Sequence, residues 1–139
     1  MKLGLAFSGG KDSLACLLLH KEQLNEITVF WADTGKTYPE TLEIIKYAMS
    51  ISPNFVQVLV DKDGQNDHWG LPADVVPIEW TRDGQAMTCE KPVMVQSYMQ
   101  CCYENIAAMV NNAAKAHGVT HMISGQRNEE NRKGTTKDG

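Results

Sequence analysis

The chain lacks the features that mark several common classes of protein. It has no long hydrophobic run, because only Lys2 precedes a short apolar stretch, Leu3 to Phe7, which is far too short for a signal peptide or a membrane-spanning helix. It also has no excess of positive charge, since 13 lysines and arginines against 17 aspartates and glutamates give a net charge of −4. This balance offers no electrostatic argument for binding to DNA, RNA or an anionic membrane. Without an export signal, the cytoplasm is the expected location.

Cysteine is scarce as well. The chain contains 4 cysteines, of which Cys101 and Cys102 are adjacent, and this arrangement does not resemble the disulfide framework of a secreted protein. A reducing compartment fits better. Cys16 lies among leucines, so we expect a small core residue rather than a reactive thiol. A length of 139 residues, 42% of them hydrophobic, allows one core and predicts a single domain over residues 1–139.

The amino-terminal segment has the pattern of a strand, a glycine-rich loop and a helix. Leu3 to Phe7 is the strand, Ser8 to Ser13 is the loop, and leucines at helical spacing predict a helix from Ser13 to about Leu24. Such a turn presents the first backbone amides of a helix, together with the positive end of its dipole, to an anion. Gly9 and Gly10 would let the backbone approach a phosphate closely and adopt positive φ. The segment therefore predicts a phosphate-binding loop.

The polar side chains of this loop suit a nucleotide. Ser8 and Ser13 add hydroxyl donors, and Lys11 adds a mobile positive charge. Asp12 would repel a bare phosphate, which suggests a magnesium ion that bridges its carboxylate and the phosphate oxygens. The loop lacks the four-residue spacer and the Gly-Lys-Ser/Thr ending of the Walker pattern.

Three further apolar runs predict the rest of a sheet, at residues 27–31, 55–60 and 119–124. We expect an α/β fold with a single parallel sheet, helices on both faces, right-handed crossovers and strand order 3-2-1-4. Thr37 and Glu40 have the spacing of a capping box, and the helix that follows should bury Leu42, Ile45 and Met49.

Residues 61–91 show no sustained period and predict a long loop. His68, Trp69, Trp80 and Arg82 give this segment aromatic and basic groups. Two interpretations remain open: these groups close over a bound nucleotide or sulfur donor, or they pack on the domain and keep the loop ordered.

Pro92 opens the longest helical pattern, which ends near His117 and Gly118. The apolar stripe places Cys102 on the buried side and Cys101 roughly 100° around the helix from it. Two interpretations of the pair remain open at this point: ordinary core cysteines, or ligands of a metal or cluster.

Polar residues follow the ends of the second and fourth predicted strands. Asp33 and Thr34 follow the second, and Gly125 to Arg127 follow the fourth, so both groups should lie on the sheet edge that carries the loop. Arg127 is the residue that we favour for a two-pronged contact with phosphate or sulfate oxygens. Arg132 or Lys133 could supplement this contact. The alternatives are a connecting turn at Asp33 and Thr34, and a solvated charged tail that includes Arg127 and the mobile residues 128–139.

Three motifs together carry a family resemblance. Ser-Gly-Gly-Lys-Asp-Ser at residues 8–13 resembles the pyrophosphate loop of the ATP pyrophosphatase, or adenine nucleotide alpha hydrolase (PP-loop), superfamily. Residues 33–43, Asp-Thr-Gly-Lys-Thr-Tyr-Pro-Glu-Thr-Leu-Glu, and residues 125–130, Gly-Gln-Arg-Asn-Glu-Glu, resemble its phosphoadenylyl-sulfate (PAPS) reductase branch. The motifs occur in the order of that family and span nearly the whole chain.

This resemblance implies an enzyme that binds phosphoadenylyl sulfate or ATP and acts on the phosphate or sulfate end, with Lys11, Asp12 and Arg127 as catalytic residues. It also implies that Asp33 and Thr34 contact the adenosine end, and that thioredoxin or glutaredoxin is the partner of a reductase. Iron–sulfur members carry a cysteine pair where Cys101 and Cys102 stand, which suggests an iron–sulfur or zinc site. Their second cysteine pair and the basic pair after the first are absent here. Cys89 is the other nearby thiol.

Two alternatives belong to other functional classes. One is an ATP pyrophosphatase that adenylates an acceptor and releases pyrophosphate, with magnesium on Asp12. The other is a catalytically inactive nucleotide-binding or partner-binding module. The chain stops at Gly139 without a cysteine at the family's nucleophile position, so we expect a fragment or a shortened member. A homo-oligomer is compatible with each interpretation.

Overall fold

The computed structural model describes residues 1–88 and 94–126. The chain forms two compact units. The first unit contains Met1–Trp31, Thr37–Gln57 and the residues from Ala114 onward. The second unit contains Ala32–Lys36 and Val58–Ala113. Each unit is described by itself below.

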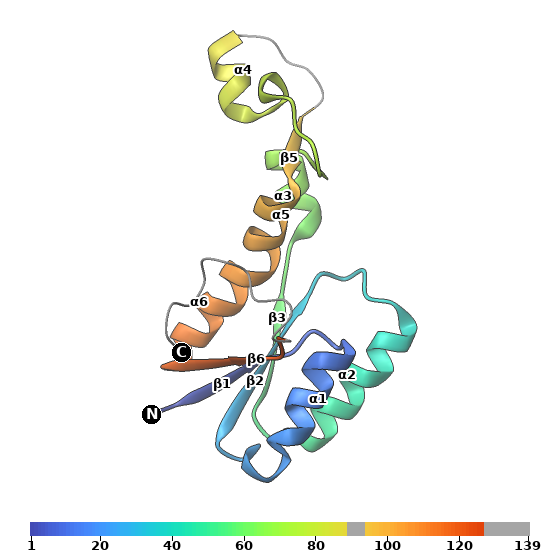
Figure 1. Cartoon of the computed structure of the whole chain (residues 1–139), viewed down its shortest axis with the longest axis vertical. Coiled ribbons are helices and arrows are strands. Elements are labelled where there is room, and N and C mark those ends of the chain that lie inside the picture. Colours follow the sequence, from blue (N-terminus) through green and yellow to red (C-terminus); the bar gives the residue numbers. More distant parts are fainter. Residues whose placement is uncertain (89–93, 127–139) are drawn as a thin grey trace. The chain divides into compact units, whose positions relative to one another are not determined.

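A four-stranded parallel sheet is the centre of the fold (Figure 1). The spatial order is β3-β2-β1-β6, which confirms the predicted order 3-2-1-4. Leu5 of β1 pairs with Val29 of β2 on one side and with Ile123 of β6 on the other. The strands are β1 Leu3–Ala6, β2 Ile27–Asp33, β3 Phe55–Leu59 and β6 His121–Ser124.

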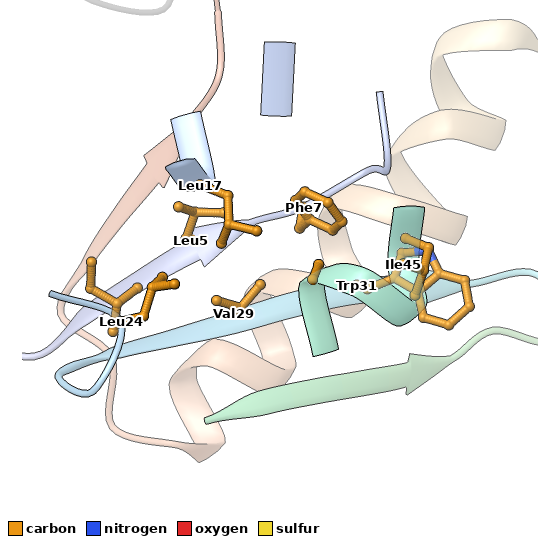
Figure 2. Close-up of a cluster of buried hydrophobic side chains, with 9 residues drawn as sticks. Leu5, Phe7, Leu17, Leu24, Val29, Trp31 and Ile45 are labelled. Carbon is orange, nitrogen blue, oxygen red and sulfur yellow. The ribbon is translucent and has the colours of Figure 1, made fainter. Parts of the chain in front are cut away.

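Helices lie on both faces of this sheet, as predicted. One face is covered by α1 (Lys11–Leu19) and α2 (Pro39–Ile51), whose apolar side chains join those of β1 and β2 in one buried cluster. Figure 2 shows this cluster, which includes Leu5, Phe7, Leu17, Leu24, Val29, Trp31 and Ile45. Phe30 alternates with Val29 along β2, so its side chain points to the opposite face. There its ring packs edge to face against His117, just after α6 (Ala108–Ala116), with a centroid separation of 5.6 Å.

Helix α1 is shorter than predicted. It ends at Leu19, and a 3₁₀ turn at Lys21–Gln23 leads to Leu24. Leu24 is buried because that turn folds it back onto the core, and not because the α-helix reaches it. A buried leucine at the correct spacing therefore extended the prediction past the true helix end.

The predicted capping box at the start of α2 is wrong. The N-cap is Tyr38, and no side chain caps this end among the described residues. Pro39 occupies the first helical position, where its fixed φ starts the helix and holds the preceding residue extended. Thr37 therefore lies one residue too early to cap. Met49 was also misplaced: its side chain is 45% exposed, and Ala48 is buried instead.

The second unit gives regular structure to most of the segment predicted as a long loop. Its elements are α3 Lys62–Trp69, β4 Leu71–Ala73, a 3₁₀ turn Ile78–Trp80, α4 Arg82–Thr88 and β5 Val95–Ser97, and β4 pairs with β5 in parallel. Asp61 caps α3, because its Oδ1 accepts a hydrogen bond of 2.9 Å from the amide of Gly64. Helix α3 is almost entirely polar, so hydrophobic periodicity could not reveal it.

The long helix predicted from Pro92 is replaced by several elements in the described part of that segment. After β5, Ser97 caps α5 (Tyr98–Cys102), a π-helix follows over Tyr103–Ala107, and α6 continues the helix. A π-turn inserts a residue into the helical repeat and shifts the phase of everything after it. The residue buried after the π-helix is Val110, whereas Cys101, before it, is buried in place of the predicted Cys102. Asn105, within the π-helix, is buried as well.

Candidate nucleotide-binding site

The loop between β1 and α1 is built on two glycines with different conformations. Gly9 is buried and has φ +78°, and a Cβ at this position would lie 2.6 Å from Cγ2 of Thr41 and 3.1 Å from Cδ1 of Ile45. Gly10 is exposed and extended, with φ −79° and ψ 164°, and a Cβ there would meet just the Ser8 Oγ, at 3.5 Å. Positive φ, predicted for both, therefore holds for Gly9 alone. Gly9 is required by the fold, whereas Gly10 keeps the outer surface of the loop open.

Two serine hydroxyls close the loop from inside. The Ser8 amide donates to Oγ of Ser13 at 3.3 Å, and the two Oγ atoms lie 3.1 Å apart. The Ser13 hydroxyl in turn donates to the carbonyl oxygen of Gly10 at 2.9 Å, and its residue is 6% exposed. Ser13 thus fixes the curvature of the loop, while Ser8 is exposed on its outer side.

The amino end of α1 has charged side chains beside it. Gly10 is the N-cap, and its amide donates to Oγ of Ser8 at 3.4 Å. The first backbone bond of the helix runs from Leu14 N to Gly10 O at 2.9 Å. Amides ahead of that bond point out of the helix end. Lys11 is exposed and makes no ion pair with a described carboxylate, and Asp12 is half-buried. This arrangement can hold an anion at the helix end and place one cation and one carboxylate next to it.

The end of β6 packs directly on this loop. A Cβ on Gly125 would lie 2.6 Å from the carbonyl oxygen of Asp12 and 3.1 Å from Cα of Ser13. Gly125 therefore lies against the first turn of α1, where the sequence predicted it. Sequence reasoning did not foresee that its lack of a side chain is what allows this approach. Arg127, Arg132 and Lys133 lie outside the described residues.

Asp33 and Thr34 belong to the second unit. Asp33 ends β2, and its Oδ1 accepts a hydrogen bond of 2.9 Å from the amide of Gly35, which has φ +70°. Its carbonyl oxygen accepts from the amide of Val60 at 2.9 Å. The bond from the Gly35 amide makes an Asx turn at the end of the strand, and the bond from Val60 ties this strand end to the residue after β3. The adenosine-binding role of Asp33 and Thr34 stays a prediction.

The cysteine pair does not fit a metal or cluster site within the described residues. Cys101 is 7% exposed and accepts hydrogen bonds from Nδ2 of Asn105, at 3.0 Å on its carbonyl oxygen and 3.5 Å on its Sγ. Cys102 is half-buried, the reverse of the predicted order. Over residues 1–88 and 94–126, no three side chains of His, Cys, Asp or Glu come together as metal ligands. Cys89 lies outside these residues.

Cys16 packs against the core cluster of the first unit, as predicted. Desolvation raises the pKa of its thiol above the ordinary value, because burial disfavours the thiolate. A neutral thiol is a poor nucleophile. Cys16 is therefore a structural residue.

The aromatic and basic residues of the second unit stack on one another. The rings of His68 and Trp69 meet edge to face at 5.0 Å, and the guanidinium carbon of Arg82 lies 5.5 Å from the Trp69 ring centroid. Arg82 Nη1 also donates to Nε2 of His68 at 2.5 Å. Trp80 is 40% exposed. The stack supports the interpretation in which these groups order their own segment.

Comparison with known proteins identifies the family of the chain. The family of the phosphoadenosine phosphosulfate reductase domain matches residues 2–138. No curated protein matches the chain. Across the described part of the chain, no helix is both long and apolar enough to span a membrane. Members of this family bind sulfonucleotides, are usually enzymes and use thioredoxin-type partners. The chain thus belongs to the phosphoadenosine phosphosulfate reductase domain family, within the PP-loop superfamily.

Proposed function

We propose that the chain binds an adenine nucleotide, phosphoadenylyl sulfate or ATP, with the phosphates at the loop Ser8–Ser13, and acts on the phosphate or sulfate end. The observation that carries the proposal is the amino end of α1. Its N-cap is an extended glycine, which has no side chain to cap the first amides of the helix. An anion there gains hydrogen bonds from backbone amides and a favourable interaction with the helix dipole.

The individual residues have separate roles in this proposal. The exposed Lys11 supplies positive charge to the phosphates, and the exposed Ser8 hydroxyl supplies a hydrogen bond. Gly10 keeps the approach open, because a side chain at this exposed position would occupy the space of the phosphate. Ser13 and Gly125 shape the loop from behind. Arg127 would contact the sulfate or phosphate from the segment that follows Gly125.

Asp12 fits a magnesium ion better than it fits a phosphate. Magnesium in nucleotide sites is usually held by one or two carboxylates plus phosphate oxygens and water, so a single half-buried carboxylate suffices on the protein side. When bound, the ion would neutralise charge on the phosphates. Asp12 then orients the bound nucleotide. Replacing Asp12 should weaken nucleotide binding more in the presence of magnesium than without magnesium.

The reductase reaction requires a thiol from elsewhere. A thiolate would attack the sulfur of the sulfonucleotide, the S–O bond to phosphate would break, and the nucleotide would leave as its phosphate. The first step leaves a thiosulfonate. A second thiolate, from thioredoxin or glutaredoxin, would then attack the cysteine sulfur of this group, the bond between the two sulfur atoms would break, and sulfite would leave with a disulfide formed. Cys16 is unsuited to the first step because burial raises its pKa, and Cys101 is buried. Neither Cys16 nor Cys101 therefore suits the role of nucleophile.

A second candidate function is ATP pyrophosphatase activity, in which the chain adenylates an acceptor and releases pyrophosphate. The pairing of Asp12 with a glycine-rich anion loop favours it, because magnesium on this carboxylate would stabilise the leaving pyrophosphate. A non-catalytic nucleotide-binding or partner-binding module, alone or as a homo-oligomer, is the third candidate.

Product analysis separates these functions. The full chain is incubated with phosphoadenylyl sulfate and reduced thioredoxin or glutaredoxin, and separately with ATP and magnesium. Sulfite release supports the reductase, and pyrophosphate release supports the pyrophosphatase. Nucleotide-dependent thermal stabilisation without either product supports the binding module. The absence of products and of stabilisation with both nucleotides would contradict the proposal.

A further inference from the structure

A cavity of about 220 Å³ lies within the second unit and plays no part in the nucleotide proposal. Its apolar wall is formed by Trp69, Val76 and Val95. Arg82, Ser97 and Gln100 add hydrogen-bond donors to the lining. A cavity of about 150 Å³ in a protein core can hold benzene, so this one has room for a molecule of roughly ten non-hydrogen atoms. Apolar walls with a few convergent polar groups are the usual lining of a small-molecule site.

Arg82 is held in one orientation without neutralisation of its charge. The Trp69 ring supports the guanidinium plane at 5.5 Å, and His68 Nε2 accepts a hydrogen bond from its Nη1 at 2.5 Å. Neither partner is anionic. No described carboxylate lies within ion-pair distance of Arg82. A guanidinium with a fixed plane and uncompensated charge suits two-pronged binding of a carboxylate, sulfonate or phosphate.

The floor of the cavity is rigid as well. Gln96 is 2% exposed, and its side chain exchanges two hydrogen bonds with Gln65, at 2.7 and 2.8 Å. Its Nε2 also donates to the carbonyl oxygen of Gly70 at 2.8 Å. Gly70 has φ +95°, and a Cβ there would overlap the backbone of Met94, so β4 and β5 approach as closely as glycine allows. The wall of the cavity that β5 forms is therefore held in place by these bonds.

From these observations we propose that the second unit binds a small organic anion in this cavity. The anionic group would pair with Arg82, and a compact apolar part would contact Trp69, Val76 and Val95. The Ser97 Oγ accepts the amide hydrogen of Gln100 at 3.1 Å, and its own hydroxyl hydrogen is a second donor for the anion. This proposal does not depend on the nucleotide site, since its lining residues come from the second unit alone.

Asp83 provides a second test of the proposal, with an effect opposite to that of Arg82. It also lines the cavity, and it is exposed, so its carboxylate sits at the solvent side and repels an anion. Removing this charge should tighten anion binding, while removing the charge of Arg82 should weaken it. Opposite effects from adjacent residues are the signature of an anion in this cavity, and a purely apolar ligand would respond to neither charge.

The probes are benzoate, phenyl phosphate, the neutral analogue benzamide, and inorganic phosphate. Each is titrated into the ¹⁵N-labelled full chain, and the indole N–H signal of Trp69, assigned with Trp69→Phe, is followed. We expect saturable shifts with benzoate and phenyl phosphate, at least tenfold weaker binding of benzamide, and at least tenfold weaker binding of inorganic phosphate. Equal binding of inorganic and phenyl phosphate would overturn the role of the apolar walls. If neither organic anion produces a saturable shift of the Trp69 signal in the wild-type chain, the proposal is overturned.

The variants then test the named residues. Arg82→Gln should weaken benzoate binding at least tenfold, and Asp83→Asn should strengthen it about threefold. Lys115→Gln removes an exposed charge of α6 that does not line the cavity, and it should leave the affinity unchanged. Lys11→Ala should also leave it unchanged, which separates failure here from failure of the nucleotide proposal. Unchanged benzoate affinity in a folded Arg82→Gln chain would overturn the assignment.

Discussion

At the scale of single residues, the two loop glycines, Gly9 and Gly10, have different structural roles. Gly9 has a left-handed backbone and lies against Thr41 and Ile45, while Gly10 is extended and open. Both appear identical in the sequence, because a Gly-Gly pair indicates flexibility without indicating which residue uses it. Assigning the roles required the position of α2, which comes from a part of the chain some thirty residues away.

Gly9→Ala should destabilise the chain. The left-handed φ costs about 1–2 kcal/mol with a Cβ, and overlap with Thr41 adds about 1–3 kcal/mol. Gly10→Ala should change stability by less than about 1 kcal/mol, since alanine adopts its conformation freely. Urea unfolding of the two variants measures this difference. Equal destabilisation would show that the loop has another backbone conformation.

Gly10→Val and Lys11→Ala should weaken nucleotide binding without loss of the fold. The valine side chain would occupy the phosphate approach, and loss of the Lys11 charge should lower affinity about tenfold or more, as expected for a charge-assisted contact of about 1.5–3 kcal/mol. Calorimetric titration of ATP and of phosphoadenylyl sulfate gives the affinities. Lys21→Ala, another exposed lysine beyond α1, is the matched control. Wild-type affinity in both loop variants would remove the loop from the site.

Cys16 should react slowly with alkylating reagents. Burial raises its pKa, so at any pH below that value a smaller fraction is thiolate than in a free cysteine. The native chain at pH 8.5 should therefore incorporate iodoacetamide at Cys16 several-fold more slowly than the urea-unfolded chain, with the gap narrowing as the pH rises. Peptide mass spectrometry quantifies the modification. A native rate equal to the unfolded rate would show that Cys16 is exposed.

At the scale of elements, strands were predicted better than helix ends. Strands of a parallel sheet are usually buried on both faces, so β1 and β2 appear as apolar runs whatever surrounds them. The edge strand β3 is also apolar in sequence, although Val58 is its one buried residue. Helix ends and buried faces depend on local features. Pro39 moved the start of α2, and the π-helix at Tyr103–Ala107 puts the buried residues on its two sides, Cys101 and Val110, out of the regular helical spacing from which Cys102 was predicted. Helix α3 was not predicted because its sequence is almost entirely polar. Its Gln65 is instead held by hydrogen bonds to Gln96, a partner far away in the sequence.

The contact between β6 and α1 gives an element-scale prediction. Gly125→Ala should push the end of β6 away from the first turn of α1, because its Cβ would overlap the backbone of Asp12. Overpacking of this kind costs about 1–3 kcal/mol, and nucleotide affinity should fall with it because the loop moves. Gly118→Ala is a control without steric overlap, although its φ of +69° carries its own strain. Urea unfolding and nucleotide titration of both variants provide the test, and unchanged stability in Gly125→Ala would contradict this contact.

At the scale of the whole molecule, the family match and the fold point to the same ligand class. The sheet order, the helix after β1 and the position of Gly125 at the loop follow from the first unit alone. Sequence motifs could predict this part because its contacts form between neighbouring strands and the loops that end them. The second unit could not be predicted in the same way, since buried amides and stacked rings carry its order.

The most direct measurement of the central claim is a crystal structure of the full chain with ATP or phosphoadenylyl sulfate bound. The phosphate oxygens should lie within hydrogen-bond distance of backbone amides at the amino end of α1, with the Lys11 ammonium beside them. A nucleotide bound with its phosphates away from residues 8–13 would contradict the account.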